Sequence, residues 1–290
     1  MGNNTRDIRR RIRSVKSTAQ ITKAMQMVAA SKMRKAQDSA LKARPYAGMA
    51  LSLLRDAIDL DNDLRAHPLI AGRDGGRACV LVVTTDRGLC GSLNTNLLRL
   101  VNALPPDTEF VTVGRKGRAF LAKTRRRLLA DFPVPDPVRF TAARQVGRFL
   151  LNHFAQGNCD RVDVIYSKFV NTAVQRPATA RLLPFTEMGA LKSAGAAGDG
   201  ERRDGIGYKL EPSPRAVLDL LLPHAVNFEV FHALLEARAS EHSARMVAMK
   251  NATDNAKQLV KDLTLEYNKA RQAGITNEIL EIAAAAAAMG

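Results

Sequence analysis

The stretch that decides the fold is residues 6–40, RDIRRRIRSVKSTAQITKAMQMVAASKMRKAQDSA, which contains neither proline nor glycine. Apolar and small residues recur along it at alternating steps of four and three, and two polar residues stand in the same register. These positions are Ile8, Ile12, Val15, Ala19, Thr22, Gln26, Ala29, Met33, Ala36 and Ala40. Such a repeat lines one face of a helix for contact with another helix. The stretch therefore predicts a long N-terminal helix in a coiled coil, assigned to residues 1–60.

The end of the chain carries a matching repeat. Only Pro223 and Gly274 interrupt helix-compatible sequence between residues 217 and 289. The repeat runs through Leu235, Ala239, His242, Met246, Met249, Thr253, Ala256, Val260, Leu263, Tyr267 and Ala270. Because the two repeats have the same period, we expect residues 213–290 to form a second helix that pairs with the first.

Charge distinguishes the two predicted helices. Residues 1–45 hold 12 Lys and Arg against Asp7 and Asp38, and so account for most of the net charge of +16. Residues 213–290 hold 8 basic and 9 acidic side chains. A strongly basic start is compatible with nucleic-acid binding, with an anionic surface or with a cleaved transit peptide. The unbroken repeat past residue 30 argues against cleavage.

Between the predicted helices the pattern changes to alternating strands and helices. Residues 77–85 and 109–114 read as buried strands, followed by helical patterns at 93–104 and 115–129. A further helix at 142–155 precedes a strand at 160–170. This alternation predicts a Rossmann-like α/β domain with a largely parallel sheet over residues 77–187. A Gly-rich flexible loop and a short foot segment, residues 188–212, follow it.

No active site can be assigned from the sequence. The loop Asp86 to Ser92 has two glycines between a strand and a helix, but neither GxGxxG nor GxxxxGK[ST] occurs in the chain. We interpret it as a tight turn. The five histidines are scattered, and the three cysteines show no metal-binding spacing. We therefore expect no catalytic, cofactor-binding or metal-binding residues and no disulfide. No uninterrupted apolar run approaches the length of a membrane span, so we expect a soluble or peripheral protein.

Four segments in order carry a family resemblance. They are ITKAM with MVAASKM at residues 21–33, TDRGLCG at 85–91, MVAMKNATDN at 246–255 and YNKARQ at 267–272. The chain closely resembles the gamma subunit of F-type ATP synthase from about residue 6 to its end. That resemblance implies a central rotor shaft, in which an antiparallel coiled coil of the terminal helices turns inside a ring of alpha and beta subunits.

The resemblance also implies partners and a location. The expected partners are the alpha and beta subunits, the epsilon subunit and the membrane c-ring, with no nucleic acid and no cofactor. The expected location is peripheral, on the cytoplasmic face of the bacterial plasma membrane. Catalysis would take place on the beta subunits, so the chain itself would be non-catalytic. The smooth end at residues 282–290 is either a frayed alanine tail or a helix tip that partner subunits sheathe in an apolar collar.

Individual residues acquire expected roles from the same resemblance. The expected contacts with the acidic segments of beta, with the energy-coupling region and with a polar catch on a beta loop are Lys23, Met25, Arg34, Arg245, Arg271, Gln272, Thr276 and Glu278. Tyr208 and Glu211 are the expected contacts with the membrane ring. A solvated helix face is the alternative for the basic residues.

Two other classes of protein stay open at this point. A basic coiled-coil nucleic-acid binder would explain the charge, although the middle domain lacks interleaved aromatic and basic residues for base stacking. A Rossmann-type enzyme would explain the α/β domain but would leave the long terminal helices without a purpose.

Overall fold

The computed structural model describes residues 2–60, 67–73, 75–185, 211 and 213–289. Side chains are described for these residues except 2–4, 43–60, 214 and 286–289. The chain divides into two compact units. The first combines Met1–Ala30 with Arg245–Gly290, and the second is Ser31–Ala244. Two long helices, α1 (Gly2–Leu60) and α6 (Pro214–Met289), each contribute to both units.

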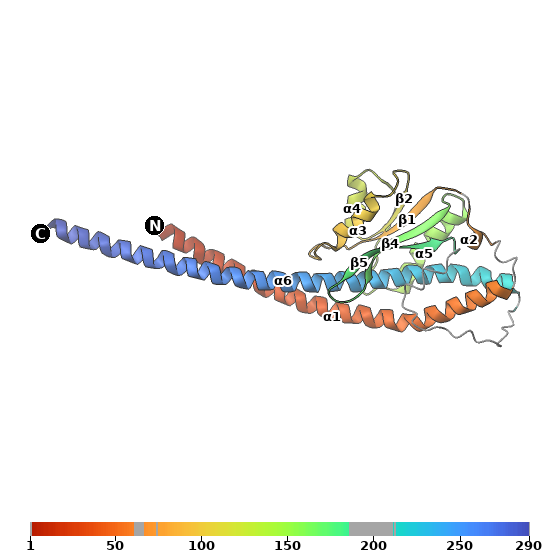
Figure 1. Ribbon diagram of the computed structural model, residues 1–290, viewed down its shortest axis with the longest axis horizontal. Helices are drawn as coiled ribbons and strands as arrows, with labels where there is room; N and C mark the ends of the chain where they lie inside the picture. The colour runs from red at the N-terminus through yellow and green to blue at the C-terminus, as the bar shows by residue number, and fades with distance from the viewer. Residues whose placement is uncertain (1, 61–66, 74, 186–210, 212, 290) are drawn as a thin grey trace. The chain divides into compact units, whose positions relative to one another are not determined.

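The second unit is built on a five-stranded sheet in the order β3-β2-β1-β4-β5 (Figure 1). The strands are β1 (Ala78–Val83), β2 (Glu109–Val113), β3 (Arg127–Phe132), β4 (Arg161–Phe169) and β5 (Gln175–Leu183). All neighbouring strands are parallel except β4 and β5, which are antiparallel. The central strands β1 and β2 are buried along their whole length, as the continuous apolar sequence of β1 predicts; β2 also buries the polar residues Glu109 and Thr112.

Helices cover both faces of the sheet. The short helices are α2 (Pro68–Ala71), α3 (Leu93–Asn102), α4 (Arg115–Lys123) and α5 (Phe140–Ala155). Val80 and Val82 of β1 point to a core formed with Leu97 of α3 and Leu121 of α4. The alternate residues of β1 belong to a larger core on the other face, which α5 and α6 complete. That core includes Cys79, Leu81, Val83, Val146, Leu150, Phe154, Val226, Val230 and Leu234. The predicted Rossmann-like domain is confirmed.

Helix α6 is long and apolar enough to cross a membrane by length and composition alone. Its best window of 18 residues has a mean hydropathy of 1.2, and 56% of that window is buried inside the structure. Leu218, Leu222, Val226 and Val230 of α6 are fully buried in the cores of the second unit. These apolar side chains are therefore covered by the protein itself.

One carboxylate in the second unit contacts both long helices. Asp136, in the loop between β3 and α5, accepts a hydrogen bond of 2.7 Å from Lys32 Nζ of α1. His242 Nε2 of α6 lies 3.4 Å from the same carboxylate oxygen. Partial burial acts to raise the pKa of Asp136, but the Lys32 hydrogen bond and the nearby His242 outweigh it and leave the pKa below its usual value. The loop is thus tied to α1 and α6 by charge as well as by packing.

Two features of the predicted domain are wrong in detail. The helix expected at residues 115–129 ends at Lys123, and the strand β3 begins at Arg127. Arg125 takes a left-handed conformation, with φ of 53°. The backbone N–H groups of Arg125 and Arg126 donate to Ala122 O and Leu121 O, which closes the end of α4. The Arg126 side chain then donates to the carbonyls of Asn102, Leu104 and Pro105 at the end of α3 and its turn. The antiparallel edge strand β5 was not predicted.

The turn before α4 gives a test of this packing. Gly114 has φ of +100°, and a Cβ there would overlap the carbonyl oxygen of Thr84. Gly114→Ala is therefore expected to destabilise the second unit by about 2 kcal/mol or more, because it adds backbone strain to a steric overlap. The midpoint of urea unfolding measures this loss.

The matched control is Gly88→Ala, at a glycine that has open space around its Cβ position and no positive φ. This variant should unfold within about 0.5 kcal/mol of the parent chain. Equal midpoints for the two variants would contradict the proposed close approach at Gly114.

Candidate functional site

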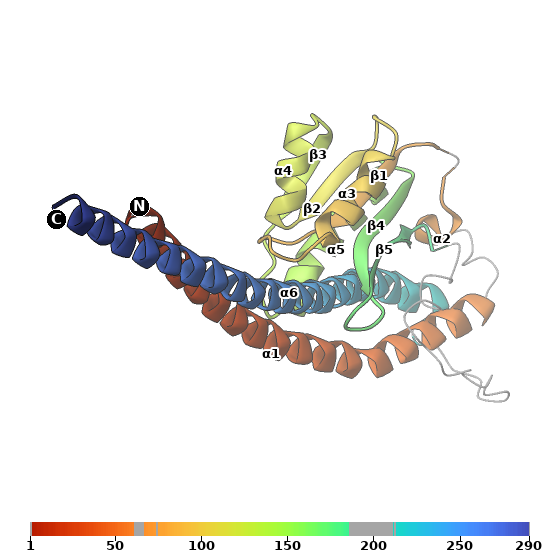
Figure 2. The same ribbon diagram turned by 60° about the vertical axis from the view of Figure 1, so that its left-hand side comes forward.

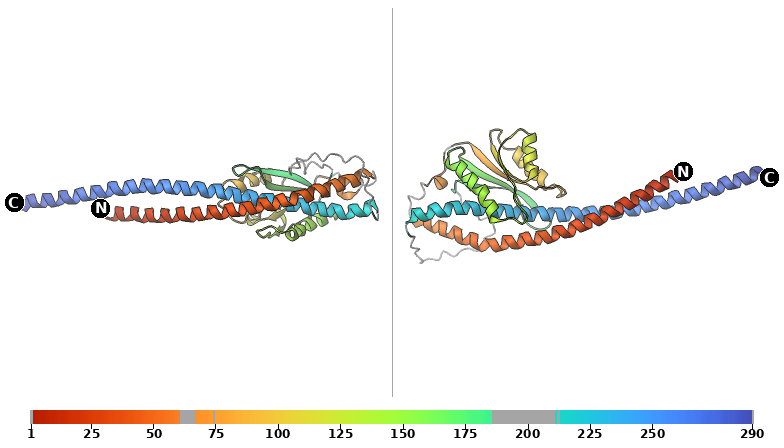
Figure 3. Two further views of the ribbon diagram at one scale, coloured as in Figure 1. Left: turned by 90° about the horizontal axis from the view of Figure 1, so that it is seen from below. Right: turned by 180° about the vertical axis from the view of Figure 1, so that it is seen from behind.

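The first unit is a pair of helices in contact along the predicted repeats. The α1 and α6 segments of this unit run side by side in opposite directions in every view (Figure 2 and Figure 3). On α1, Ile8, Thr22 and Ala29 are buried, and the repeat positions between them are half-buried. On α6 the same holds for Met249, Thr253, Ala256 and Leu263. The predicted seam between the two helices is confirmed here.

A buried hydrogen bond sets the register of the seam. Thr22 Oγ1 and Thr253 Oγ1 lie 2.7 Å apart. Each hydroxyl also lies within hydrogen-bond distance of a carbonyl of its own helix, 3.0 Å from Thr18 O for Thr22 and 2.8 Å from Met249 O for Thr253. Because each hydroxyl has one proton, one threonine donates across the seam and the other donates back along its helix. Both hydroxyls are therefore satisfied without water.

Lys23 and Met25 flank this bond on opposite sides of α1. Lys23 is exposed, and Met25 is half-buried beside the seam. From the pairing of Thr22 with Thr253, antiparallel helices place Met25 level with about residue 250 of α6. Arg245, which is half-buried, is then about 7 Å further along the axis at about 1.5 Å per residue. Arg245, which we expected near the height of Met25, therefore lies about one and a half helical turns from that level along the axis.

The charge on the outward side of α1 in this unit is almost wholly basic. Arg6, Arg9, Arg10, Arg11, Arg13, Lys16 and Lys23 are all exposed. The ion pair of Arg10 with Asp7, at 3.2 Å, joins two exposed side chains. The α6 segment of the same unit mixes six basic with five acidic side chains. The helix pair therefore presents one basic side and one nearly neutral side.

The four residues of the expected polar catch lie on one exposed length of α6. Arg271, Gln272, Thr276 and Glu278 are all exposed. At about 100° per residue, Gln272 and Thr276 share one face, and Arg271 and Glu278 share a neighbouring one. Thr276 Oγ1 donates to the carbonyl of Gln272 at 3.0 Å, which holds its side chain against its own helix.

Beyond about residue 273, α6 extends past the first residue of α1, as Figure 1 shows at the C-terminal end. Here apolar side chains are exposed rather than buried. Their exposed fractions are 48% for Ile275, 61% for Ile279, 60% for Leu280 and 70% for Ile282. Exposed apolar residues gathered along one helix are typical of a surface that another molecule covers.

This apolar stripe was not predicted from the sequence, although the spacing of its isoleucines indicates it. The seam continues from Ala270 to half-buried Gly274 and Asn277, whereas Ile275, Ile279 and Ile282 repeat at steps of four and three one position later. A shift of one residue turns the apolar face by about 100° around the helix. The stripe therefore faces away from the line of the seam.

The remaining expected contacts are spread over the chain. Arg34 is exposed on the part of α1 that belongs to the second unit. Glu211 is exposed, whereas Tyr208 lies outside the described residues. The structure gathers the α6 catch residues and the Lys23–Met25 pair into the first unit, and it does not bring Arg34 or Glu211 into that unit.

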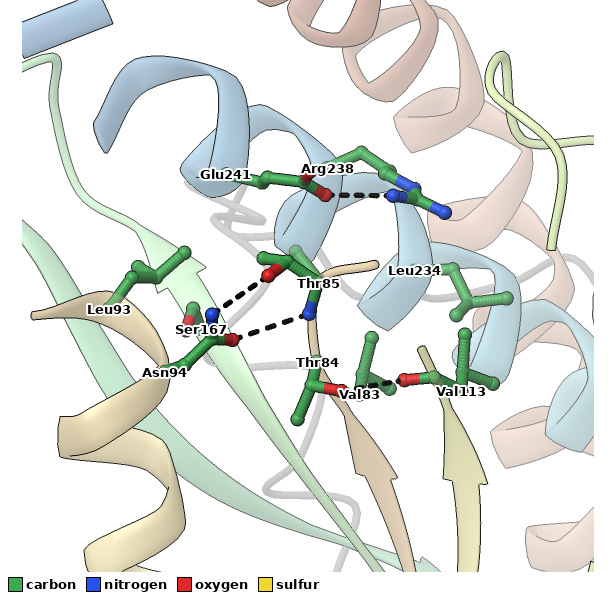
Figure 4. A pocket seen from close by; sticks show the side chains of 11 residues that line it. Val83, Thr84, Thr85, Leu93, Asn94, Val113, Ser167, Leu234, Arg238 and Glu241 are labelled. Carbon is green, nitrogen blue, oxygen red and sulfur yellow. Dashed lines mark hydrogen bonds and ion pairs between the residues drawn. The ribbon is translucent and has the colours of Figure 1, made fainter. Parts of the chain in front are cut away.

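The second unit contains the crevice where Rossmann-like sheets bind ligands, and it is nearly closed. This crevice lies at the carboxyl ends of β1 and β4, where the strand order reverses. Leu234, Ala237, Arg238 and Glu241 of α6 line it (Figure 4). The Arg238 guanidinium is held there by Glu241 at 2.7 Å and by the carbonyl of Val134 at 2.9 Å. The cavity that remains is about 10 Å³, room for about one water molecule and not for a nucleotide.

The helix N-terminus beside the crevice is also occupied by the chain itself. The backbone N–H groups of Arg115, Lys116 and Gly117 donate to Asp86 Oδ1, to Thr85 O and to Thr84 Oγ1. These are the groups that would bind a phosphate at the start of α4. The turn at Gly114 therefore leaves none of these three amides free for a phosphate. In the part of the chain that the structure describes, no group of three or more His, Cys, Asp or Glu is arranged to hold a metal ion.

Comparisons with known proteins all identify ATP synthase. The sequence model of the family described as ATP synthase matches residues 4–289. The ATP synthase gamma chain of Opitutus terrae is 50% identical over 286 residues, which cover 97% of each chain. The corresponding protein of Akkermansia muciniphila is 49% identical over 293 residues and 99% of each chain.

Solved structures agree with the sequence comparisons. A chain in the rotor of the Euglena gracilis mitochondrial ATP synthase is similar with a TM-score of 0.66 and 25% identity, covering 95% of this chain and 100% of that one. A chain in the central stalk and c-ring of the Tetrahymena thermophila mitochondrial ATP synthase is similar with a TM-score of 0.62 and 26% identity, covering 80% of this chain and 99% of that one.

The threonine pair in the seam can be tested by a double-mutant cycle. Thr22→Val alone should destabilise the helix pair by about 1 kcal/mol, because it removes one buried hydrogen bond. Adding Thr253→Val should recover most of that loss, because both partners then become apolar groups of similar shape. Hydrogen exchange of the α6 amides around residues 249–260 reports the local opening free energy.

Thr18→Val is the matched control, since Thr18 is exposed and its hydroxyl bonds only to the carbonyl of Ser14. It should leave exchange nearly unchanged. If the costs of the two single threonine variants simply add in the double variant, the two hydroxyls are not coupled across the seam.

Proposed function

The chain belongs to the gamma chain family of ATP synthase, and we propose that it is the central rotor shaft of an F-type ATP synthase. Its partners in this proposal are the alpha and beta subunits around the helix pair, the epsilon subunit and the membrane c-ring. The solved structures that it resembles come from the rotor and the central stalk with c-ring of such complexes. The comparisons give no support to the alternative of a nucleic-acid-binding coiled coil.

The observation that carries the proposal is a helix pair that satisfies its own apolar seam and presents two unlike sides. The buried seam residues satisfy one another within the chain, and most of the outward side chains are polar or charged, although apolar residues such as Ile21, Met27 and Val28 are exposed among them. One side carries the seven exposed basic residues of α1, and the other mixes both signs. A rotor requires such asymmetry, because only differential contacts can shift a surrounding site between conformations.

In this proposal each expected contact residue meets a particular partner subunit. Lys23, Met25 and Arg34 would meet acidic segments of the beta subunits, with Arg245 near the same level. Exposed basic residues suit a moving contact, because surface ion pairs contribute only about 0–1 kcal/mol each and release easily. Arg271, Gln272, Thr276 and Glu278 would engage a beta loop as a polar catch. Tyr208 and Glu211 would meet the polar loops of the c-ring.

The exposed stripe at the end of α6 fits the collar interpretation better than a frayed tail. Ile275, Ile279 and Ile282 keep the regular spacing of one helix face while they lie in solvent in the isolated chain. An apolar ring of alpha and beta residues would cover them without directional bonds. A collar of that kind holds the tip on the axis and lets it turn.

A non-catalytic role accords with the closed crevice. Arg238 and Glu241 fill the position where a Rossmann-like domain would bind a nucleotide, and the neighbouring amides are already bonded. We therefore place ATP chemistry on the partner subunits. We also infer that the chain lies at the cytoplasmic face of the bacterial plasma membrane through its contact with the c-ring.

Co-purification tests the proposal directly. The chain, expressed with the alpha and beta subunits of the same organism, should co-elute with them as one complex that hydrolyses ATP. A variant with Ile275, Ile279 and Ile282 all changed to Asp should bind the hexamer more weakly, because it adds charge to the collar contact. Recovery of the hexamer without this chain, under conditions where the chain is folded, would overturn the proposal.

A charge introduced at Met25 tests the beta contact. Met25→Lys should retain assembly and ATP hydrolysis but lower the protons pumped per ATP. One added surface ion pair, about 0.2–1 kcal/mol, would slow release from an acidic segment by about 1.5- to 5-fold. Inverted membrane vesicles allow pumping and hydrolysis to be measured together.

The control is Met25→Leu, which keeps the apolar volume and adds no charge. It should pump as the parent chain does. Unchanged pumping per ATP in Met25→Lys would show that Met25 does not face an acidic partner segment.

A further inference from the structure

One short length of α6 is attached to the α/β domain by polar contacts rather than by apolar packing. Residues 238–243 include a group of buried polar or charged side chains, which are Arg238, Ser240, Glu241, His242 and Ser243. Nearer the start of α6, the buried side chains of Leu222, Val226 and Val230 are apolar. Because a polar side chain is costly to bury without a partner, such a group marks a place of directional contacts. We call residues 238–243 the polar clamp.

Arg238 and His242 of the polar clamp hold two loops at the carboxyl ends of parallel strands. Arg238 Nη2 donates to the carbonyl of Val134 at 2.9 Å, in the loop between β3 and α5 (Figure 4). The same nitrogen lies 3.6 Å from Asp86 Oδ2, in the loop between β1 and α3. His242 Nε2 lies 3.4 Å from Asp136 Oδ2, in the same loop as Val134. These two side chains therefore connect α6 to the part of the sheet that contains β1 and β3.

The two serines of the polar clamp hold β4 and the hairpin that follows it. Ser240 Oγ donates to the carbonyl of Ser167 in β4 at 2.8 Å. Ser243 Oγ donates to the carbonyl of Thr172, in the turn between β4 and β5, at 2.7 Å. Ser243 Oγ also accepts from Gln175 Nε2, at the start of β5, at 3.3 Å. The polar clamp thus reaches segments of the domain that are far apart in the sequence.

The two sets of contacts lie on different sides of α6. At about 100° per residue, Arg238 and His242 are about 40° apart around the helix, and Ser240 and Ser243 are about 60° apart. The middle of one pair is about 150° around the helix from the middle of the other. Apolar contacts are non-directional, whereas a hydrogen bond weakens steeply when its angle or length changes. Bonds on nearly opposite sides therefore oppose rolling of the helix about its own axis in both directions.

We propose that the polar clamp is the joint through which torque passes between the α/β domain and α6. The inference rests on the proposed rotor function and adds the place where that rotor bears its load. Helix α6 continues without interruption from the polar clamp into the paired helices of the first unit. A helix that cannot roll or slide within the domain turns when the domain turns. The clamp residues act by positioning α6, and none of them has to touch a partner subunit.

Val230 separates this role from a contribution to stability alone. Its side chain is fully buried in the larger core, on the same helix and in the same unit, but it forms no directional bond. Val230→Ala removes apolar packing and leaves every contact of the polar clamp in place. It is therefore the matched control for variants of the clamp.

The test measures how far the α/β domain turns against a fixed tip of α6. The chain is assembled with the alpha and beta subunits, and turnover is stopped so that the hexamer holds the tip. Lys123→Cys on exposed α4 takes a bead, since the three natural thiols are buried. Ser240→Ala combined with Ser243→Ala should raise the variance of the bead angle by about twofold, because one of the two sides that hold α6 is lost.

Arg238→Gln combined with Glu241→Gln removes the contacts on the other side without leaving a single buried charge. It should raise the variance in the same way. Val230→Ala should lower the midpoint of urea unfolding and leave the variance at the value of the parent chain.

Unchanged variance in an assembled clamp variant would overturn the joint, and so would an equal rise in Val230→Ala. If both clamp variants failed to fold while Val230→Ala folded, the clamp would be a structural part of the core and the proposal would also be wrong. Failure of the parent chain to assemble with the hexamer would instead overturn the proposed function.

Discussion

The structure depends on the seam between α1 and α6, where small and apolar side chains from the two ends of the chain bury one another. The buried bond between Thr22 and Thr253 fixes how far one helix is shifted along the other. A seam made only of alanine and aliphatic residues could slip by a heptad at small cost, whereas a slip here would separate the two hydroxyls and leave each with only its bond to a carbonyl of its own helix. The polar step in an apolar repeat therefore specifies the register.

The same helix that forms half of the seam also closes the α/β domain. Further back along α6, Leu234, Arg238 and Glu241 fill the crevice at the switch point of the sheet, and Val226 and Val230 complete its larger core. The fold thus retains a nucleotide-binding topology while its ligand position is taken by the chain itself. In a rotor subunit this arrangement replaces a binding site with a rigid joint between sheet and helix.

The seam, the paired helices and the parallel sheet could be predicted because they depend on local periodicity. The stop of α4 could not, because the left-handed residue at its end is Arg125 rather than the glycine or asparagine that marks a helix end in a sequence. β5 has a mixed, partly exposed pattern with a proline at position 177, which propensity alone does not identify as a strand. The closing of the crevice could not be predicted either, because the sequence of residues 234–241 predicts only a helix. The charged residues and the catch residues of the candidate site were predicted from the family resemblance. The exposed stripe at the tip could have been predicted from the shift in the apolar repeat.

That one-position shift near residue 274 has an evolutionary consequence. Before it, an apolar residue on α6 is constrained by a partner in the same polypeptide, so a change there can be compensated by a second change within one gene. After it, the stripe of Ile275, Ile279 and Ile282 has no counterpart among the α1 residues whose side chains the structure describes. Compensation for changes at the tip must come from genes for other subunits. The last turns of α6 are therefore expected to diverge more slowly than the seam, and to lose function first when the chain is exchanged between distant species.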